Sequence, residues 1–392
     1  MDEPVIIAAC RTAVGSFRGG LSSLPAPRLG AVVVAEVLRR AGISPDRVDE
    51  VIMGNVLSAG VGQAPARQAA IFAGLPTSVQ CTTINKVCGS GLKSVMLAAQ
   101  AIMVGDADVI VAGGMESMSN APYLLEKARD GYRMGNAEIV DAMMKDGLTD
   151  AYSNQAMGIG AEQCARDLGI SRKEQDDFAI LSYRRAQEAQ SEGKFNREIV
   201  PVNVPGPKGS STTFAVDEDV RKTDFEKIPT LRPAFMKDGT VTAANSSKIS
   251  DGAAAVVVTS ARIAKRLGVK PLARIAAQAS FAKDPMEFTT APADVIARVL
   301  LKSGRSVSGI DLFEINEAFA VVALAAIKVL GLSEERVNVH GGAIALGHPI
   351  GASGTRILVT LLHAMEERNT SNGVATLCIG GGEASAIVLE RD

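Results

Sequence analysis

The stretch that decides the fold is TLCIGGGEAS at residues 376–385, because VIVAGGMES at residues 109–117 follows the same design. In both, an apolar run ends in consecutive glycines, and a glutamate and a serine follow closely. Short apolar runs bounded by glycine predict buried β-strands. The repetition of the whole signature predicts that the chain contains two copies of one structural unit.

Further landmarks repeat in the same order on the N-terminal side of each copy. Residues 310–316 (IDLFEIN) mirror residues 48–55 (VDEVIMGN), and Ser353-Gly354 before an apolar helix mirrors Ser90-Gly91 before another. A helix that is apolar all round is buried on every side. Strand-like runs that alternate with helical stretches indicate an α/β layered fold. We therefore predict an α/β fold made of two duplicated halves.

A segment of different composition, residues 119–250, separates the two halves and is rich in Met, Gly, Asn and charged residues. It contains a polar helix at 171–192 that opens with a capping-box pattern, and residues 204–209 are expected to form a loop. Insertions of this size are typical of lids and binding surfaces, with an oligomerisation element as the alternative. The predicted domains are an N-terminal half (1–118 plus about 251–268), a loop domain (119–250) and a C-terminal half (269–392).

Composition limits the partners. Lys plus Arg number 41 and Asp plus Glu 43, so the net charge of −2 provides no long-range field for nucleic acid or an anionic membrane. The first four residues do not resemble a secretory signal, and no apolar run is expected to reach the roughly 18 residues that span a bilayer. Five cysteines form no C-x-x-C pair, which favours reduced thiols. A cytoplasmic enzyme is expected.

The first chemical signature is VCGSGLK at residues 87–93, where Cys88 lies at a glycine turn before a buried helix. Amides at a helix N-terminus stabilise a thiolate, so we expect the pKa of this cysteine to be lowered. The glycines allow a sharp turn and a close approach by a substrate. Alternatively, Cys88 is a small buried core residue.

The second signature is NVHGGAIALGHPIGASG at residues 338–354, which carries His348, one of three histidines. Pro349 disfavours helical backbone at His348, so the imidazole is expected to project from a loop. In the duplicated plan this loop is the counterpart of the Cys88 loop. A neutral imidazole there could activate the thiol. His340 and His363 lack such a setting, and His363, on the expected helix 357–367, is expected to be structural.

Two more segments complete the set. Cys378 precedes Gly380, Gly381 and Gly382, whose amides could face a developing oxyanion while the thiol acts as general acid or base. Asn316 ends a strand of the C-terminal half, and its amide could fix a water or a carbonyl. A zinc site of Cys88, His348 and Cys378 is disfavoured because no two of them are close in sequence.

Together the four segments resemble the thiolase family. The motifs are N-x-x-C-G-S-G, N-E-A-F, G-G-A-x-x-x-G-H-P-x-G and C-x-G-G-G, in that order, and the resemblance extends over the whole chain. It implies a five-layered α/β/α/β/α fold of two similar halves with an inserted loop domain. It also implies coenzyme A (CoA) thioesters as substrates, no required cofactor or metal, and a homotetramer or homodimer.

The resemblance also implies roles for individual residues. Cys88 would carry the acyl group, His348 would activate it, and Cys378 would move the proton of the substrate's alpha carbon or of the leaving CoA thiol. A water held by Asn316 would form one oxyanion hole with His348, and the amides of Cys88 and Gly380 would form the other. Residues at the family's CoA-contact positions are Leu148, Arg221, Ser247 and Ile249. Those resembling its acyl pocket are Met157, Phe235, Phe288 and Phe319.

A crowded pocket of this kind leaves room for short acyl groups. The implied reaction is the condensation of two acetyl-CoA to acetoacetyl-CoA and CoA, or thiolysis in reverse. Ala156, where short-chain members often have His, is a departure from that pattern. Some short-chain members also hold a potassium ion near segments similar to Ser182-Tyr183, Ala243-Ala244 and Phe288, so potassium is a further expected ligand.

Three alternatives stay open. A broad-chain 3-ketoacyl-CoA thiolase of fatty-acid β-oxidation would use the same residues. A decarboxylating ketoacyl synthase would lack the reactive cysteine of C-x-G-G-G, which is present here as Cys378. A non-catalytic CoA-binding protein on the same scaffold would have a degraded Cys, His, Cys set, and all three residues are present.

Overall fold

The computed structural model describes residues 2–391, and its centre is a mixed sheet of eleven strands. Nine strands follow the order β13-β14-β15-β12-β1-β11-β5-β3-β4, while β2 pairs with β11 and β8 with β1. The strands are β1 (Pro4–Thr12), β2 (Gly15–Ser16), β3 (Glu50–Gly54), β4 (Gln80–Ile84), β5 (Val109–Ser117), β8 (Ile199–Val200), β11 (Ser250–Ser260), β12 (Ala273–Ala282), β13 (Leu312–Ile315), β14 (Asn372–Ile379) and β15 (Glu383–Glu390).

The pairing pattern of the sheet is duplicated. In the N-terminal half β3 runs parallel to β4 and β5, β5 is antiparallel to β11, and β11 is antiparallel to β1. In the C-terminal half β13 runs parallel to β14, β14 is antiparallel to β15, and β15 is antiparallel to β12. Phe313 bridges Val337 in parallel, in the place that β4 has in the first half. The register also shifts at matching points, between Ile6 and Ala8 and between Ile275 and Ala277.

The duplication extends to single hydrogen bonds. The Asp49 carboxylate accepts bonds from the amides of Asp108 and Val109 at the start of β5. Asp311 accepts the same pair of bonds, from Ser371 and Asn372 at the start of β14. These two aspartates belong to the mirrored segments 48–55 and 310–316, so the structure confirms the duplication predicted from the sequence.

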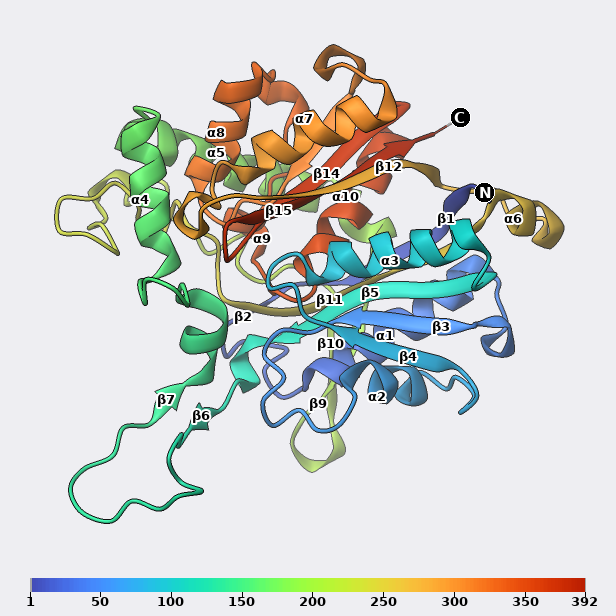
Figure 1. The fold of residues 1–392 in the computed structure, drawn as a ribbon, viewed down its shortest axis with the longest axis horizontal. Coiled ribbons are helices and arrows are strands. Elements are labelled where there is room, and N and C mark those ends of the chain that lie inside the picture. Colours follow the sequence, from blue (N-terminus) through green and yellow to red (C-terminus); the bar gives the residue numbers. More distant parts are fainter. Residues whose placement is uncertain (1, 392) are drawn as a thin grey trace.

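Helices make three layers around the two half-sheets (Figure 1). One buried cluster packs α1 and α2 against the N-terminal half-sheet, and another packs α7 and α8 against the C-terminal one. A third cluster joins α3 and α10 to strands of both halves, so this helix pair is the central layer. The predicted five-layered fold is confirmed. The helices are α1 (Ala26–Ala41), α2 (Pro65–Phe72), α3 (Ser90–Val104), α7 (Ala291–Ser303), α8 (Ala320–Leu330) and α10 (Ser353–Glu367).

The two central helices meet at matched glycines. A methyl group on Gly354 would lie 2.2 Å from the amide nitrogen of Leu92, and one on Gly91 would lie 2.9 Å from that of Thr355. Contacts this short leave no space for a side chain. The Thr355 hydroxyl also donates to the Gly91 carbonyl across 2.8 Å. The first turns of α3 and α10 are therefore packed against each other, which brings the loops before them together.

One apolar stretch is longer than expected, since the sequence was expected to contain no apolar run of about 18 residues. The 18 residues Val87–Val104 have a mean hydropathy of 1.5, so by length and composition they could cross a membrane. Over half of this stretch, 56%, is buried within the protein. Its apolar surface is used in the central layer, against α10 and the sheet.

The inserted segment packs two helices against α8 of the C-terminal half and extends two arms. It contains α4 (Met157–Asp167) and α5 (Arg172–Ser191), and α5 begins with the predicted capping box between Ser171 and Glu174. One arm, with β6 (Tyr123–Leu124) and β7 (Val140–Asp141), projects away from the body (Figure 1).

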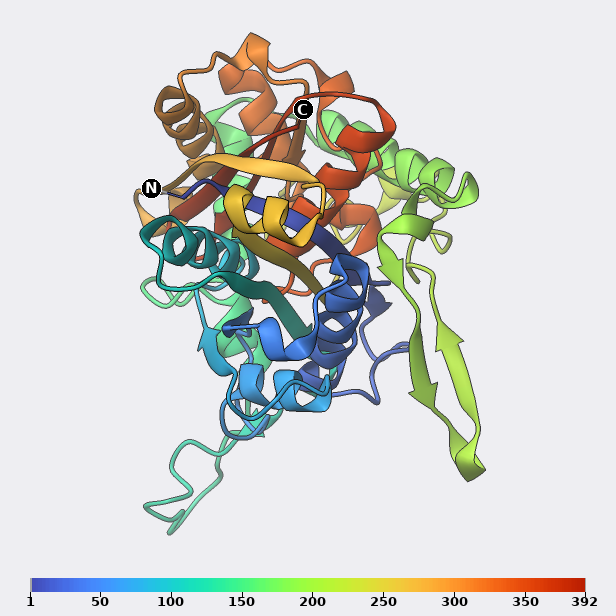
Figure 2. The same ribbon diagram turned by 90° about the vertical axis from the view of Figure 1, so that its right-hand side faces the viewer.

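The second arm is the hairpin of β9 (Val202–Pro205) and β10 (Ser211–Phe214), which extends from the body in Figure 2. The loop expected at 204–209 is therefore shorter than predicted, because Val204 and Pro205 pair with Thr212 and Ser211. The remaining helices are α6 (Ala261–Leu267), α9 (Ala343–Leu346) and a π-helical turn at Met144–Leu148, with 3-10 turns at Pro45–Arg47, Met118–Asn120, Lys194–Arg197, Pro207–Gly209, Ile228–Thr230, Pro285–Glu287, Val307–Gly309 and Glu334–Arg336.

Candidate active site

A cavity of about 600 Å³ lies where the inserted segment meets loops from both halves. Most of its lining is apolar, and His348 is its one histidine. The lining residues are Ser16, Phe17, Met118, Met144, Leu148, Ala156, Met157, Gly158, Asp219, Ala234, Phe235, Ala243, Ser246, Ser247, Lys248, Ile249, Ala318, Phe319, His348 and Ile350.

Cys88 lies in a tightly held turn between β4 and α3. The Ser90 hydroxyl accepts a bond from the Lys86 amide at 2.8 Å and donates to the Val87 carbonyl at 2.7 Å. Val87 has a φ of +45°, in the left-handed region that β-branched residues rarely adopt. Strain of this kind persists where the surrounding structure enforces it and is typical of functional sites. The turn thus presents the adjacent Cys88 in a fixed orientation.

The Cys88 sulfur faces two backbone amides, its own and that of Gly380. These amides lower the pKa of the thiol, but burial is the larger effect and raises it to about 11. The lowered pKa expected from the helix N-terminus is therefore wrong for the free protein, because α3 begins two residues later and desolvation dominates. Cys88 is a protonated thiol at neutral pH and needs a base to become a nucleophile.

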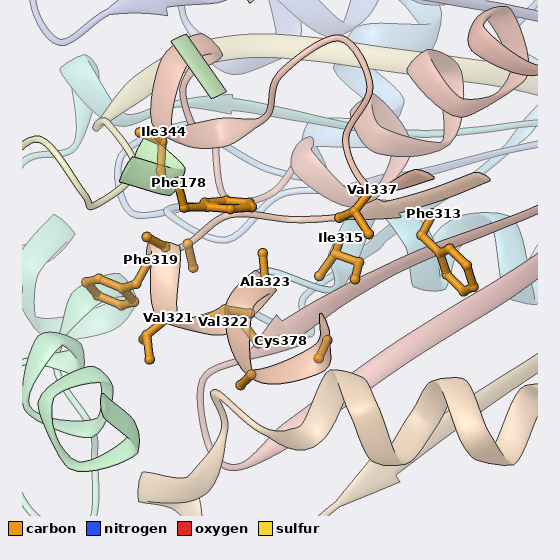
Figure 3. Close-up of a cluster of buried hydrophobic side chains, with 14 of the residues drawn as sticks. Phe178, Phe313, Ile315, Phe319, Val321, Val322, Ala323, Val337, Ile344 and Cys378 are labelled. Atoms are coloured by element: carbon orange, nitrogen blue, oxygen red, sulfur yellow. The ribbon is translucent and has the colours of Figure 1, made fainter. Parts of the chain in front are cut away.

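Cys378 lies at the end of β14, deep in the core, where Figure 3 shows it in one cluster with Ile315 and Phe319. Burial raises the pKa of its thiol well above the usual value, and the neighbouring Cys88 raises it further. The structure therefore brings the two cysteines together. Both start as neutral thiols at physiological pH.

Gly380 connects this strand end to the cavity. A methyl group on Gly380 would lie 3.5 Å from Cγ1 of Val87 and 3.7 Å from Cε of Met157, which lines the cavity. An ion pair between Lys86 and Glu383 also joins the Cys88 turn to the start of β15. Cys88, Cys378 and Gly380 thus form one group beside the cavity wall.

His348 lies in the loop between α9 and α10, with its amide bonded to the Lys248 carbonyl at 3.0 Å. Its Nδ1 is 2.5 Å from the Ser353 hydroxyl, and that hydroxyl donates to the Pro349 carbonyl at 2.9 Å. A hydroxyl has one proton, so both contacts are satisfied only when Nδ1 carries the ring proton. The Nε2 lone pair is then available, and this buried atom has no hydrogen-bond partner within residues 2–391.

His348 is a neutral imidazole in the free protein. Burial, with a smaller effect of the Arg356 guanidinium, lowers the pKa of the imidazole to about 3. The ring is therefore neutral at physiological pH, and its free Nε2 can accept a proton. Because α3 and α10 meet at their first turns, the His348 and Cys88 loops lie at the same end of the central layer.

Asn316 follows β13 and is fully buried, yet neither Nδ2 nor Oδ1 has a hydrogen-bond partner among the residues described. Its mirror residue Asn55 donates to the Glu116 carboxylate at 2.7 Å. A buried amide without a protein partner costs about 1–3 kcal/mol, which a ligand or water can recover. The duplicated asparagine is thus structural in one half and free for a ligand in the other.

The predicted acyl-pocket residues fall into two groups. Met157, Phe235 and Phe319 line the cavity, and the rings of Phe235 and Phe319 pack edge to face with centroids 6.0 Å apart. Phe288 is 2% exposed and packs behind Phe319 at 6.4 Å. Phe288 therefore supports the wall without lining the cavity.

The predicted CoA contacts also divide. Leu148, Ser247 and Ile249 line the cavity. Arg221 is exposed, and it lines neither this cavity nor the second one described next. A second cavity of about 360 Å³ adjoins the first through Asp219, Ala243 and Lys248. It is lined by Tyr183, Asp219, Lys222, Thr223, Asp224, Lys227, Ile228, Leu231, Ala243, Ala244 and Lys248.

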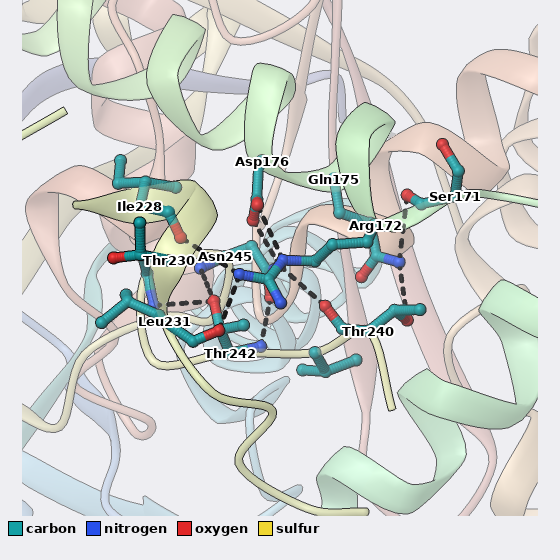
Figure 4. Close-up of polar contacts among 12 residues, drawn as sticks. Ser171, Arg172, Gln175, Asp176, Ile228, Thr230, Leu231, Thr240, Thr242 and Asn245 are labelled. Carbon is teal, nitrogen blue, oxygen red and sulfur yellow. Dashed lines mark hydrogen bonds and ion pairs between the residues drawn. The ribbon is translucent and has the colours of Figure 1, made fainter. Parts of the chain in front are cut away.

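Polar side chains of α5 hold the segment that borders the second cavity, through the contacts drawn in Figure 4. Arg172 donates to the Ile228 and Leu231 carbonyls at 3.1 and 3.0 Å and to the Asp176 carboxylate at 2.7 Å. Asp176 in turn accepts a bond from Asn245 at 2.9 Å. The polar face of α5, read from the sequence only as a capped helix, thus positions the segment that carries Phe235, Ser247 and Ile249.

Sequence reasoning missed three residues of the site. Ser353 was read as part of a repeated Ser-Gly signature, and its bond to His348 depends on the loop path. Glu116 was seen only as a repeat landmark, yet it accepts bonds from the amides of Val56 and Gly351 at 2.9 and 3.0 Å. Lys248 carried no signal beyond its charge. Residues 2–391 contain no cluster of three or more His, Cys, Asp or Glu that could hold a metal.

Two family models cover nearly the whole chain. The model "Thiolase, N-terminal domain" matches residues 4–262, and "Thiolase, C-terminal domain" matches residues 269–391. The chain belongs to the thiolase family. This thiolase is therefore an acyltransferase, as the four motifs implied.

Relatives resemble this thiolase over their full lengths. It is 55% identical to an acetyl-CoA acetyltransferase of Cupriavidus necator, over all of both chains. It is 53% identical to acetyl-CoA acetyltransferase 2 of Arabidopsis thaliana, over 98% of this chain and 96% of that one. A crystal structure of the Ascaris suum Acat5 thiolase in complex with coenzyme A superposes with a TM-score of 0.94 at 46% identity, over 100% of each chain.

Proposed function

We propose that this chain catalyses the reversible condensation of two acetyl-CoA molecules to acetoacetyl-CoA and CoA, through an acetyl group carried on Cys88. The observation that carries the proposal is the position of the Cys88 sulfur. It faces the Gly380 amide, has Cys378 as a neighbour, and lies at the same end of the central helices as the free Nε2 of His348.

In the first half-reaction His348 Nε2 takes the proton of the Cys88 thiol, and the thiolate attacks the acetyl carbonyl. The amides of Cys88 and Gly380 face the sulfur, so they are placed to bind the oxyanion that forms next to it. The C–S bond to CoA then breaks, and the leaving CoA sulfur takes the proton of Cys378. Acetyl-Cys88, an imidazolium at His348 and a thiolate at Cys378 remain.

In the second half-reaction the Cys378 thiolate removes a proton from the methyl group of a second acetyl-CoA. The resulting enolate oxygen is stabilised by the His348 imidazolium and by a water bound to the free amide of Asn316. The enolate carbon attacks acetyl-Cys88, and acetoacetyl-CoA forms. The departing Cys88 thiolate recovers its proton from His348, which restores the starting state.

The cavity supports acetyl over longer acyl groups. Met157, Phe235 and Phe319 contribute bulky side chains to its lining, and Phe288 reinforces Phe319 from behind. Full-length relatives named acetyl-CoA acetyltransferase favour the same choice over a broad-chain 3-ketoacyl-CoA thiolase.

We place CoA across the two adjoining cavities. The apolar cavity with Leu148, Ser247 and Ile249 suits the pantetheine arm. In the second cavity Lys222 and Lys227 pair with Asp219 and Asp224 in the free protein, and we expect them to exchange these carboxylates for the phosphate-bearing end of CoA. CoA binding is therefore assigned to the loop domain, residues 119–250.

The test is mass spectrometry of the protein after brief incubation with isotope-labelled acetyl-CoA. The label should appear on the tryptic peptide Val87–Lys93 and be absent in Cys88→Ser. Cys81→Ser, which replaces a partly buried cysteine of β4, is the matched control and should keep the label. Active protein without label on this peptide would exclude the proposal.

We also propose that this chain forms a homotetramer, with a homodimer as the alternative. The arm of residues 121–142 exposes large apolar side chains, among them Tyr123 at 64%, Met134 at 98% and Ile139 at 64%. Apolar surface of this kind is typical of protein interfaces. Light scattering of the intact chain and of Met134→Asp should give different molar masses if the arm joins copies, whereas equal masses exclude that role.

A further inference from the structure

The segments expected to surround a potassium ion come together only in part. Tyr183, Ala243 and Ala244 line the 360 Å³ cavity. The Ser182 hydroxyl is used elsewhere, since it donates to Glu317 at 2.7 Å and accepts from the Gly342 amide at 3.0 Å. Phe288 packs against Phe319 in the wall of the other cavity. The groups that remain for a cation are the Ala243 carbonyl and the Tyr183 ring, and both face Lys248.

The ammonium group of Lys248 contacts the Ala243 carbonyl and lies near the Tyr183 ring. Its Nζ donates to the Ala243 carbonyl at 2.5 Å and lies 5.9 Å from the centre of the Tyr183 ring. Both are ligands that a potassium ion would use, because a carbonyl dipole and the face of an aromatic ring attract any monovalent cation. Within residues 2–391 Lys248 forms no ion pair with a carboxylate, and the nearby Asp219 pairs with Lys222.

We infer that the Lys248 ammonium is the built-in monovalent cation of the loop 243–248, so that this thiolase needs no potassium ion there. An ammonium group resembles potassium in size and charge. A second cation beside it would be repelled by the ammonium charge, because the Ala243 carbonyl is a neutral dipole and leaves that charge in place. The expected potassium site therefore does not fit the residues of this chain.

The tether has a consequence for the site. It closes the loop from Ala243 to Lys248, and that loop contains Ser247 and borders both cavities. Asn245, within the same loop, is fixed to Asp176 of α5. The loop is thus ordered before any ligand arrives, which removes an ordering cost from binding. The inference rests on the proposed function only in assigning this loop to CoA.

The first measurement is the melting temperature of the ligand-free wild-type protein in KCl, NaCl and LiCl at one ionic strength. A resident ammonium predicts values that agree within about 1 °C, because an ion that does not bind cannot shift the unfolding equilibrium. A higher melting temperature in KCl than in NaCl would overturn the inference.

The second measurement is amide hydrogen exchange over residues 240–249 in Lys248→Ala, again without ligand. Exchange should accelerate about tenfold in NaCl or LiCl and return toward the wild-type rate in KCl or NH₄Cl. Lys248→Arg, which keeps a cation, should stay close to wild type. Lys237→Ala is the matched control, since it removes an exposed lysine of the same segment.

Two results of this second measurement contradict the inference. Unchanged exchange in Lys248→Ala would show that the ammonium does not order the loop. If exchange accelerates in Lys248→Ala and neither KCl nor NH₄Cl slows it again, the Lys248 ammonium does not take the place of a bound monovalent cation. Neither readout involves acetyl transfer, so failure here is separate from failure of the Cys88 labelling test.

Discussion

His348 Nδ1 lies 2.5 Å from the Ser353 hydroxyl, and this contact determines which nitrogen of the imidazole acts as the base. With the Ser353 proton given to the Pro349 carbonyl, Nδ1 must donate and Nε2 must accept. Both residues lie in the loop and first turn of α10, so the orientation is set locally. This arrangement performs the orienting task of the third member of a catalytic triad without a carboxylate.

Removal of that contact should slow acylation. In Ser353→Ala the ring loses its acceptor at Nδ1, so we expect the rate of Cys88 acetylation to fall about 10-fold to 100-fold. Rapid-quench mass spectrometry of the 87–93 peptide measures it. Ser94→Ala is the control, because Ser94 is an equally buried hydroxyl of α3 that bonds the Gly91 and Gly113 carbonyls. It should lower stability by about 1 kcal/mol while leaving acetylation unchanged.

The pH dependence of Cys88 alkylation should reveal a protonated thiol. With the pKa of Cys88 raised to about 11, the thiolate fraction is small at pH 7 and rises with pH. Iodoacetamide should therefore modify Cys88 more slowly than free cysteine, with a rate that increases about tenfold per pH unit between pH 7 and 9. Peptide mass spectrometry follows the reaction. A plateau below pH 8 would instead indicate a preformed thiolate–imidazolium pair.

Cys378→Ser should separate the two half-reactions. Condensation should fall by about 1000-fold, because a serine hydroxyl is a far weaker carbon base than a thiolate. Labelling of Cys88 by acetyl-CoA should persist, since His348 still removes the Cys88 proton. A coupled assay of acetoacetyl-CoA formation, run beside the labelling measurement, checks both. Loss of the label together with condensation would contradict the division of roles.

Glu116 joins the His348 loop to the N-terminal half, and burial raises the pKa of its carboxyl to about 7. A folded-state pKa above the unfolded value of 4.5 means that its contribution is complete below pH 4.5 and is lost as pH rises through 7. The shift corresponds to about 3 kcal/mol. Glu116→Gln should therefore flatten the dependence of unfolding free energy on pH between 5 and 8, as measured by urea denaturation.

Glu116→Gln should also affect catalysis, because the Glu116 carboxylate accepts a hydrogen bond from the amide of Gly351, three residues from His348. We expect a lower turnover with little change in the KM for acetyl-CoA. Asp251→Asn is a suitable comparison, since Asp251 is a buried carboxylate of β11 that bonds Ser119 instead of the His348 loop. Equal effects of the two substitutions on turnover would argue against a positioning role for Glu116.

The acyl preference should shift when the cavity is widened. Phe235→Ala removes one of two rings packed edge to face at the cavity wall, so thiolysis of 3-ketohexanoyl-CoA relative to acetoacetyl-CoA should rise about tenfold. A substrate panel of increasing chain length measures the ratio of kcat/KM values. Phe195→Leu, in a buried aromatic away from the cavity, should cost stability and leave the ratio unchanged.

Much of the fold could be predicted because duplication leaves two independent copies of each signal. Asp49 and Asp311 stand at matching places in two similar stretches, and they make the same pair of bonds. The glycine-rich loops that carry Cys88, His348 and Cys378 could also be found from the sequence, because they occupy related places in the two copies. The hairpin at 202–214 escaped prediction because Pro205 and Pro207 read as loop residues, although an edge position tolerates proline.

The site was less predictable where its chemistry depends on surroundings rather than on residue type. A cysteine before a helix predicts a lowered pKa, but desolvation of the partly buried Cys88 thiol reverses the sign of the shift. Arg221 could be assigned to CoA from the position it shares with a family CoA contact, yet its side chain is exposed and lies outside both cavities. The contacts of Lys248 with Ala243 and Tyr183 depend on the path of a loop that no local pattern specifies.

The position of β1 in the middle of the sheet affects the order in which the protein is completed on the ribosome. β1 ends at Thr12, while its neighbours β11 and β12 begin at Ser250 and Ala273. β1 must therefore wait, without β11 and β12, until the Cys88 loop and the whole inserted segment have been made. Contacts between residues so distant in sequence form slowly. The half that carries the nucleophile can be finished only after the segment that we assign to CoA binding.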